Sequence, residues 1–214
     1  MSAKCVIILD VPYGGGILIA KTLEEFGYSL GGDDTKSYND YQLMAVNQIV
    51  CDKVDEPKMA LKNAKYAHEP MSLYIKSKVD QGKPWVMIDP MLCVTFCEFI
   101  PLLKAHDVDY KIVITMRQPH HSVFDMLKNN KQWNLEKASS LMGRYVVARS
   151  MNTERFFVEN KEEKEKVMHL SFNDVIDDSE NTVKAIANFV GVDLTDEMHN
   201  KAVERLKPFP APQQ

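Results

Sequence analysis

Residues 5–27 read CVIILDVPYGGGILIAKTLEEFG, and this stretch decides the fold. It opens on a short, uninterrupted apolar run from Cys5 to Leu9, which is typical of a strand covered on both faces in a parallel sheet. Pro12 and three glycines break the run, and apolar residues at helical spacing follow until Gly27. The order of strand, glycine turn and helix predicts the opening unit of a P-loop-like, nucleotide-binding α/β fold.

The rest of the chain alternates between strand and helix patterns. Further strands are expected at 85–88, 110–116 and 167–172, and helices at 37–54, 59–80, 93–104, 119–127, 134–160, 179–190 and 195–206. Asn134 is a predicted helix cap, and the charged residues 159–166 are expected to form a solvated helix end and loop. Because each crossover must return over a face of the sheet, the pattern predicts a three-layer α/β sandwich around a mostly parallel central sheet.

The chain has 214 residues, of which 45% are hydrophobic and 26% charged, as expected for one globular domain. We expect this domain to span residues 1–207, with residues 208–214 as a flexible, proline-rich tail.

A net charge of -4 argues against a general nucleic-acid binder. No apolar run reaches the ~18 residues that cross a bilayer, and no secretory leader pattern opens the sequence, so we expect a cytoplasmic protein without a membrane partner. No metal site is expected: Cys93 and Cys97 lack a second pair, and the adjacent His120 and His121 point about 100° apart on a helix.

Ligands of parallel sheets bind outside the carboxyl ends of the strands. Three turns are expected to meet there, at residues 12–17, 89–92 and 117–125.

The motifs at these turns resemble the sulfotransferase family. That family opens with a strand, then Pro-Arg/Lys-Ser-Gly-Thr-Ser/Thr, then a helix, where this chain has Pro-Tyr-Gly-Gly-Gly-Ile at 12–17. Its second turn often reads Lys-Asp-Pro-Arg, against Ile-Asp-Pro-Met at 88–91. Its third strand ends on Arg-x-Pro with a serine eight residues after the arginine; Arg117 and Pro119 match, and position 125 is aspartate.

Later segments continue the resemblance. Tyr145 lies on the long helix, Leu-Ser-Phe-Asn-Asp at 170–174 stands where the family favours Ser-Tyr-Glu-Asp-Leu, and the helix ending at Gly191 resembles the family's Phe-Leu-Gly helix end. The resemblance implies 3′-phosphoadenosine 5′-phosphosulfate as donor and sulfuryl transfer to a small-molecule hydroxyl or amine that the sequence does not identify.

By this resemblance, the donor's phosphosulfate would lie at the first turn, on Tyr13, Gly14, Gly15, Gly16 and Ile17. The glycines leave backbone N–H groups free for an anion at a helix N-terminus, although a plain flexible turn would have the same sequence. The family's basic residue falls on Tyr13 and its hydroxyl pair on Gly16 and Ile17, so the turn lacks a cation.

Three further positions, Arg117, Phe172 and Asp89, have two readings each. Arg117 either binds the 3′-phosphate or forms an ion pair with Asp125, which replaces the family's phosphate-binding serine; Ser122 is a possible substitute for that serine. Phe172 either packs on the adenine or belongs to the core. Asp89 is either the base near the acceptor or the cap of the following helix.

Two functions follow from these readings. The first is a small sulfotransferase with a divergent donor site and weak or lost activity, unless Lys21, Lys128 or Arg144 supplies the missing charge. The alternative is a non-catalytic or repurposed domain that binds another anionic ligand or a protein partner. An ATP-using kinase is disfavoured because no Gly-Lys-Ser/Thr follows the glycines.

Overall fold

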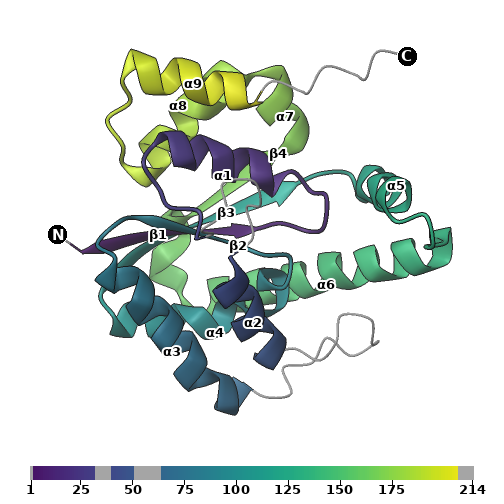
Figure 1. Cartoon of the computed structure of the whole chain (residues 1–214), viewed down its shortest axis with the longest axis horizontal. Helices are drawn as coiled ribbons and strands as arrows, with labels where there is room; N and C mark the ends of the chain where they lie inside the picture. The colour runs from purple at the N-terminus through teal and green to yellow at the C-terminus, as the bar shows by residue number, and fades with distance from the viewer. Residues whose placement is uncertain (1, 32–39, 51–63, 207–214) are drawn as a thin grey trace.

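A parallel sheet forms the centre of the molecule (Figure 1). The computed structural model describes residues 2–31, 40–50 and 64–206. Within them the sheet has four strands in the order β2-β1-β3-β4, and every neighbouring pair is parallel. The strands are β1 (Ala3–Leu9), β2 (Trp85–Ile88), β3 (Val108–Met116) and β4 (Val167–Ser171). The predicted parallel sheet is confirmed.

Helices cover both faces of this sheet (Figure 1). One face carries α1 (Gly16–Glu25), α7 (Phe172–Asp177), α8 (Ser179–Val190) and α9 (Asp196–Leu206). The other carries α2 (Tyr41–Val50), α3 (Ala64–Asp80), α4 (Leu92–Ala105) and α6 (Leu135–Glu159), and α5 (Pro119–Asn129) packs against α6. The predicted three-layer sandwich is therefore confirmed.

Strand β1 supplies core residues to both layers, as its uninterrupted apolar run predicts. Cys5, Ile7 and Leu9 belong to the core beneath α2, α3, α4 and α6. Val6 and Ile8 belong to the core beneath α1, α8 and α9. Side chains alternate between the faces of a strand, so a strand buried on both sides must be apolar throughout.

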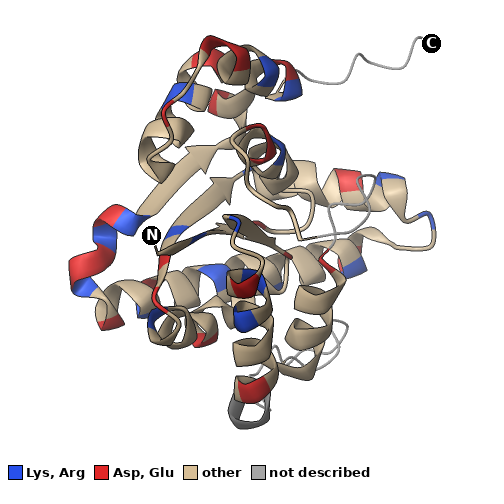
Figure 2. Cartoon of the chain, turned by 60° about the vertical axis from the view of Figure 1, so that its left-hand side comes forward, with Lys and Arg blue, Asp and Glu red and all other residues tan. Residues whose placement is uncertain are grey.

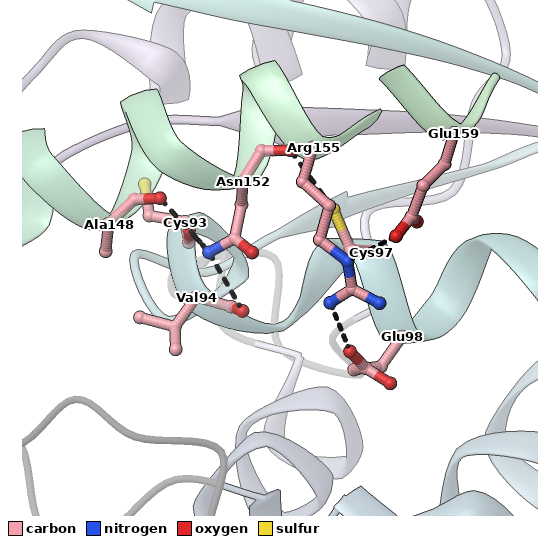
Figure 3. Close-up of polar contacts among 8 residues, drawn as sticks. All are labelled: Cys93, Val94, Cys97, Glu98, Ala148, Asn152, Arg155 and Glu159. Atoms are coloured by element: carbon pink, nitrogen blue, oxygen red, sulfur yellow. Dashed lines mark hydrogen bonds and ion pairs between the residues drawn. The ribbon is translucent and has the colours of Figure 1, made fainter. Parts of the chain in front are cut away.

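Polar contacts fix the long helix α6 against α4 (Figure 3). The Asn152 amide nitrogen donates to the carbonyl oxygens of Cys93, Val94 and Ala148 at 3.1, 3.3 and 3.1 Å. One turn further on, the Arg155 guanidinium donates to Glu98 and Glu159, each at 2.8 Å. Since α4 starts directly after β2, these contacts hold α6 in register with the carboxyl edge of the sheet.

The charged segment after α6 is more ordered than predicted. It forms the short 3₁₀ helix η1 (Lys161–Lys166), along which acidic and basic residues alternate (Figure 2). Burial would raise the pKa of the Glu163 carboxyl, but hydrogen bonds from Lys104, Tyr110 and Lys166 outweigh it and hold the pKa at about 2. The expectation of a merely solvated loop is wrong for this residue.

One helix was not expected. The predicted strand 167–172 ends at Ser171, and Phe172 begins α7. A helix of six residues makes fewer than two turns, so it leaves no helical periodicity in the sequence.

The structure also bears on the remaining predicted strands, helices and the helix cap. Strand 85–88 is confirmed, and Asn134 caps α6 by accepting a hydrogen bond from the Lys137 N–H at 2.8 Å. The helices expected at 37–54 and 59–80 are seen as α2 and α3. Asp40, expected inside the first helix, precedes it, and its Oδ1 accepts hydrogen bonds from the N–H groups of Gln42 and Leu43, both at 3.1 Å. The other remaining residues, like the tail 208–214, lie outside the described residues. No described helix is both long and apolar enough to cross a membrane. The single domain over 1–207 stays a prediction.

Candidate functional site

The turn between β1 and α1 lies at the carboxyl edge of the sheet. Gly15 has φ 103°, a left-handed conformation that favours glycine, and a Cβ there would also overlap the Phe172 ring. The N–H of Gly14 donates to the Val11 carbonyl at 2.8 Å. Within the described part of the chain, the N–H groups of Gly15 and Ile17 have no hydrogen-bond partner. Two backbone donors are thus free at the start of α1.

The carboxylate of Asp10 lies inside this turn. Its Oδ2 accepts a hydrogen bond from the Gly16 N–H at 2.7 Å, and its Oδ1 accepts one from the Thr115 hydroxyl. A Cβ at Gly14 would overlap Asp10 Oδ1, and one at Gly16 would lie 2.7 Å from Asp10 Cβ. Glycine at both positions is therefore what makes room for the carboxylate.

Burial raises the pKa of Asp10. The side chain is 9% exposed, and desolvation shifts its pKa from 3.8 to about 6, against the opposing effects of its hydrogen bonds to Thr115 and Gly16 and the charges of Arg149 and Arg117. About nine-tenths of the Asp10 side chains are consequently ionised at pH 7. A negative charge occupies the turn at neutral pH and is partly lost in mild acid.

Arg117 lies at the end of β3 and is bound to the chain itself. Its Nη1 donates to Asp125 Oδ2 and to the Tyr13 carbonyl oxygen, both at 2.7 Å. The guanidinium carbon lies 4.6 Å from the centroid of the Phe172 ring. The ion pair with Asp125 is confirmed, while a role in phosphate binding stays a prediction. The Arg117 Nε is buried without a hydrogen-bond partner among the described residues.

Ser122 and Tyr13 are joined by a hydrogen bond, and a role of either in binding the nucleotide stays a prediction. Ser122 is fully buried, and its hydroxyl donates to the Tyr13 carbonyl at 3.2 Å. The Tyr13 side chain is 41% exposed on a backbone with φ 60°. Serine and arginine together hold the backbone of the turn through this one carbonyl.

Asp89 lies at the end of the neighbouring strand β2. It is 6% exposed, its Oδ1 accepts a hydrogen bond from the Met91 N–H at 2.6 Å, and burial raises its pKa. Since α4 begins at Leu92 with Met91 at its cap position, Asp89 stabilises the turn before the helix and is not the N-cap itself. The structure does not test Asp89 as a base.

Sequence reasoning overlooked two residues at this edge, Asp10 and Arg149. Arg149 Nη1 donates to the Thr115 carbonyl at 2.5 Å, so a chain of contacts joins α6 through Thr115 to Asp10. Asp10 directly follows a buried strand and precedes a glycine turn, but this pattern alone does not place its side chain inside the turn. His120 and His121 are exposed with ring centroids 4.2 Å apart, and no described cluster of three His, Cys, Asp or Glu residues could hold a metal ion.

A family model described as "Sulfotransferase family" matches residues 34–196. The chain belongs to the sulfotransferase family. The match includes the second and third turns, the long helix and the segment around Phe172, and begins after the glycine turn.

A solved sulfotransferase domain has a similar fold. The sulfotransferase domain of the Synechococcus PCC 7002 olefin synthase superposes with a TM-score of 0.52 at 13% identity, over 94% of this chain and 77% of that one. Retinol dehydratase in complex with androsterone and the inactive cofactor PAP gives a TM-score of 0.48 at 13% identity, over 95% of this chain and 64% of that one. No curated protein sequence matches the chain significantly.

Proposed function

We propose that this sulfotransferase-family protein binds 3′-phosphoadenosine 5′-phosphosulfate at the turn of residues 12–17 and transfers its sulfuryl group slowly to a small-molecule hydroxyl or amine. The observation that carries the proposal is the pair of free N–H groups on Gly15 and Ile17, at the N-terminus of α1 and beside Arg117. Such a helix N-terminus attracts anions.

The residues of the turn suit a bound anion, except that two carboxylates of the chain lie beside it. Free backbone donors and the unpartnered Nε of Arg117 suit phosphate oxygens. Asp10 and Asp125 oppose them, because each is a carboxylate bonded to a group that the nucleotide would use. We expect binding to be weak at neutral pH and to strengthen as Asp10 takes up a proton.

Several side chains have separate roles in this proposal. The donor, when bound, supplies the sulfuryl group. Gly15 and Ile17 hold its charged end through their N–H groups, and Phe172 gives an apolar surface beside Arg117. Asp89, whose pKa is raised by burial, is our candidate to accept the proton of the attacking hydroxyl or amine.

Transfer should be slow because positions 13 and 91, where the family has basic residues, are Tyr13 and Met91 in this chain. The loss of one well-placed donor in a transition-state site typically costs about 10²–10³ in rate.

We also propose a cytoplasmic setting, which the free, buried thiols of Cys5, Cys93 and Cys97 support.

Calorimetric titration of the desulfated nucleotide, 3′-phosphoadenosine 5′-phosphate, tests the binding half of the proposal. We expect measurable binding that Arg117→Ala weakens by about 1.5–3 kcal/mol, the range for hydrogen bonds to charged groups. Lys184→Ala, which removes an exposed charge from α8, is the matched control and should bind as the wild type does. Radiolabelled sulfuryl transfer to a panel of alcohols and amines tests the other half.

A repurposed domain without transfer activity is the second candidate. The bonds from Gly16 to Asp10 and from Arg117 to Asp125 favour it, because they occupy donors of the turn with the chain's own carboxylates. Failure of the desulfated nucleotide to bind at millimolar concentration, at both pH 5.5 and pH 7.5, would select this candidate.

A further inference from the structure

We propose that a groove between α6, η1 and the edge of the sheet at β3 and β4 binds a small amphipathic anion, a carboxylate on an apolar chain. The groove has a volume of about 550 Å³. Small-molecule sites commonly measure about 300–1,000 Å³. No residue of the glycine turn lines this groove, although Arg149 lines it and also bonds to Thr115 beside Asp10.

Apolar side chains form the body of the groove. Buried Ile114 and half-buried Phe157 line it, together with Met116 and Val158, which are 42% and 62% exposed. Apolar surface of this extent, left to water along a concave site, favours a partner with an apolar body.

The charged side chains around the groove are predominantly basic. Arg149, Lys161 and Lys164 line it, against a single carboxylate, Glu154, among its lining residues. None of the three cations has an ion-pair partner within the described residues. Lys166, on the same short helix, is instead paired with Glu163 at 3.1 Å. The excess of unpaired positive charge therefore lies at the groove, which selects an anionic head group.

Two polar groups in the groove have unused hydrogen-bonding capacity. The Thr153 hydroxyl is buried and has no partner among the described residues, and Thr153 lines the groove. Arg149 uses only its Nη1, on the Thr115 carbonyl, in the hydrogen bonds that the described chain provides. Buried polar groups without a partner are uncommon, so the Thr153 hydroxyl marks this part of the groove as one that a ligand would complete.

The spacing of the charged and apolar groups sets the size of the ligand. From Ser150 to Val158 the helix rises by about 12 Å at about 1.5 Å per residue, which suits an extended chain of about ten carbons whose carboxylate lies at Lys161 and Lys164, just beyond the end of the helix. Decanoate is accordingly the probe, with 1-decanol as its neutral analogue.

Calorimetric titration of decanoate below its micellar concentration tests the site. We expect saturable binding, with decanol about tenfold weaker, as the loss of charge-assisted hydrogen bonds predicts. The double variant Lys161→Gln/Lys164→Gln should lose about tenfold in affinity for decanoate. The matched control, Lys83→Gln/Lys184→Gln, removes two exposed charges elsewhere and should leave the affinity unchanged.

Four results would overturn the proposal: no saturable decanoate binding, equal affinity for decanol, an equal loss in the control variant, or preference for an acidic amphipathic peptide over decanoate. Thermal melting of both double variants verifies that they fold. Titration of 3′-phosphoadenosine 5′-phosphate into Lys161→Gln/Lys164→Gln should match the wild type, which separates failure of this site from failure of the nucleotide site.

Discussion

Replacing Asp10 by asparagine should stabilise the protein at neutral pH. Asp10 is buried in the glycine turn, where its carboxylate accepts hydrogen bonds from the Gly16 N–H and the Thr115 hydroxyl. An asparagine can keep both contacts, because its oxygen accepts from Gly16 while its amide donates to the hydroxyl of Thr115, which can rotate to accept. Asp10→Asn thus removes a buried charge at nearly constant shape.

The size of the effect follows from the pKa of Asp10. A rise from 3.8 to about 6 on folding means that the ionised form is destabilised by about 3 kcal/mol, at 1.36 kcal/mol for each pH unit. The pKa of Asp10 is higher in the folded than in the unfolded state, so the protonated side chain favours folding and its contribution is complete below about pH 4. The free energy of unfolding decreases as the pH rises towards 6, because folding then opposes ionisation of Asp10. The advantage of Asp10→Asn over the wild type should widen by about 2 kcal/mol between pH 4.5 and pH 7.5.

Urea denaturation of wild type, Asp10→Asn and Asp109→Asn at these two pH values measures the difference. Asp109 is exposed on β3, so Asp109→Asn controls for the loss of a carboxylate. If the gap between Asp10→Asn and wild type is the same at both pH values, or if the variant is less stable at pH 7.5, our account of the Asp10 charge is wrong.

Three other perturbations have definite outcomes. Arg117→Ala leaves Asp125 without its partner and should lower the free energy of unfolding by about 1–3 kcal/mol, whereas an unchanged melting temperature would deny the ion pair a structural role. Asn152→Ala removes two hydrogen bonds that join α6 to α4 and a third within α6, and should cost about 1–3 kcal/mol in urea denaturation; a loss below about 0.5 kcal/mol would contradict this. Glu163→Gln should destabilise the protein at pH 7, because the ionised Glu163 accepts three hydrogen bonds. The pKa of Glu163 is lower in the folded state, so the wild type loses stability as the pH falls from 4.5 to about 2, and Glu163→Gln should lack this loss. Retention of the full acid sensitivity in Glu163→Gln would refute that assignment.

The sequence predicted the fold well because the fold depends on patterns that extend over many residues. The apolar run of β1, the strand at 85–88 and the cap at Asn134 all appear as expected. The short helix α7 was overlooked because it is shorter than the period that would reveal it.

The candidate site was harder to predict, because its chemistry depends on where side chains meet. The three predicted turns follow the carboxyl ends of β1, β2 and β3. The sequence raised the Arg117–Asp125 pair only as an alternative, and it gave no reason to place Asp10 among the glycines. Asp10 and Thr115 are 105 positions apart, and only the parallel pairing of β1 with β3 brings them together.

We infer that this chain's own carboxylates, Asp10 and Asp125, compete with a nucleotide for the N–H groups and the arginine at the turn of residues 12–17. Titration of 3′-phosphoadenosine 5′-phosphate into wild type and Asp10→Asn/Asp125→Ser at pH 7.5 tests it most directly. Removing two negative charges beside a phosphate site should tighten nucleotide binding by about tenfold or more. This figure allows for the weakening of charge–charge repulsion by solvent near a protein surface. Equal affinity of the two proteins would show that neither carboxylate opposes the nucleotide and would contradict the account.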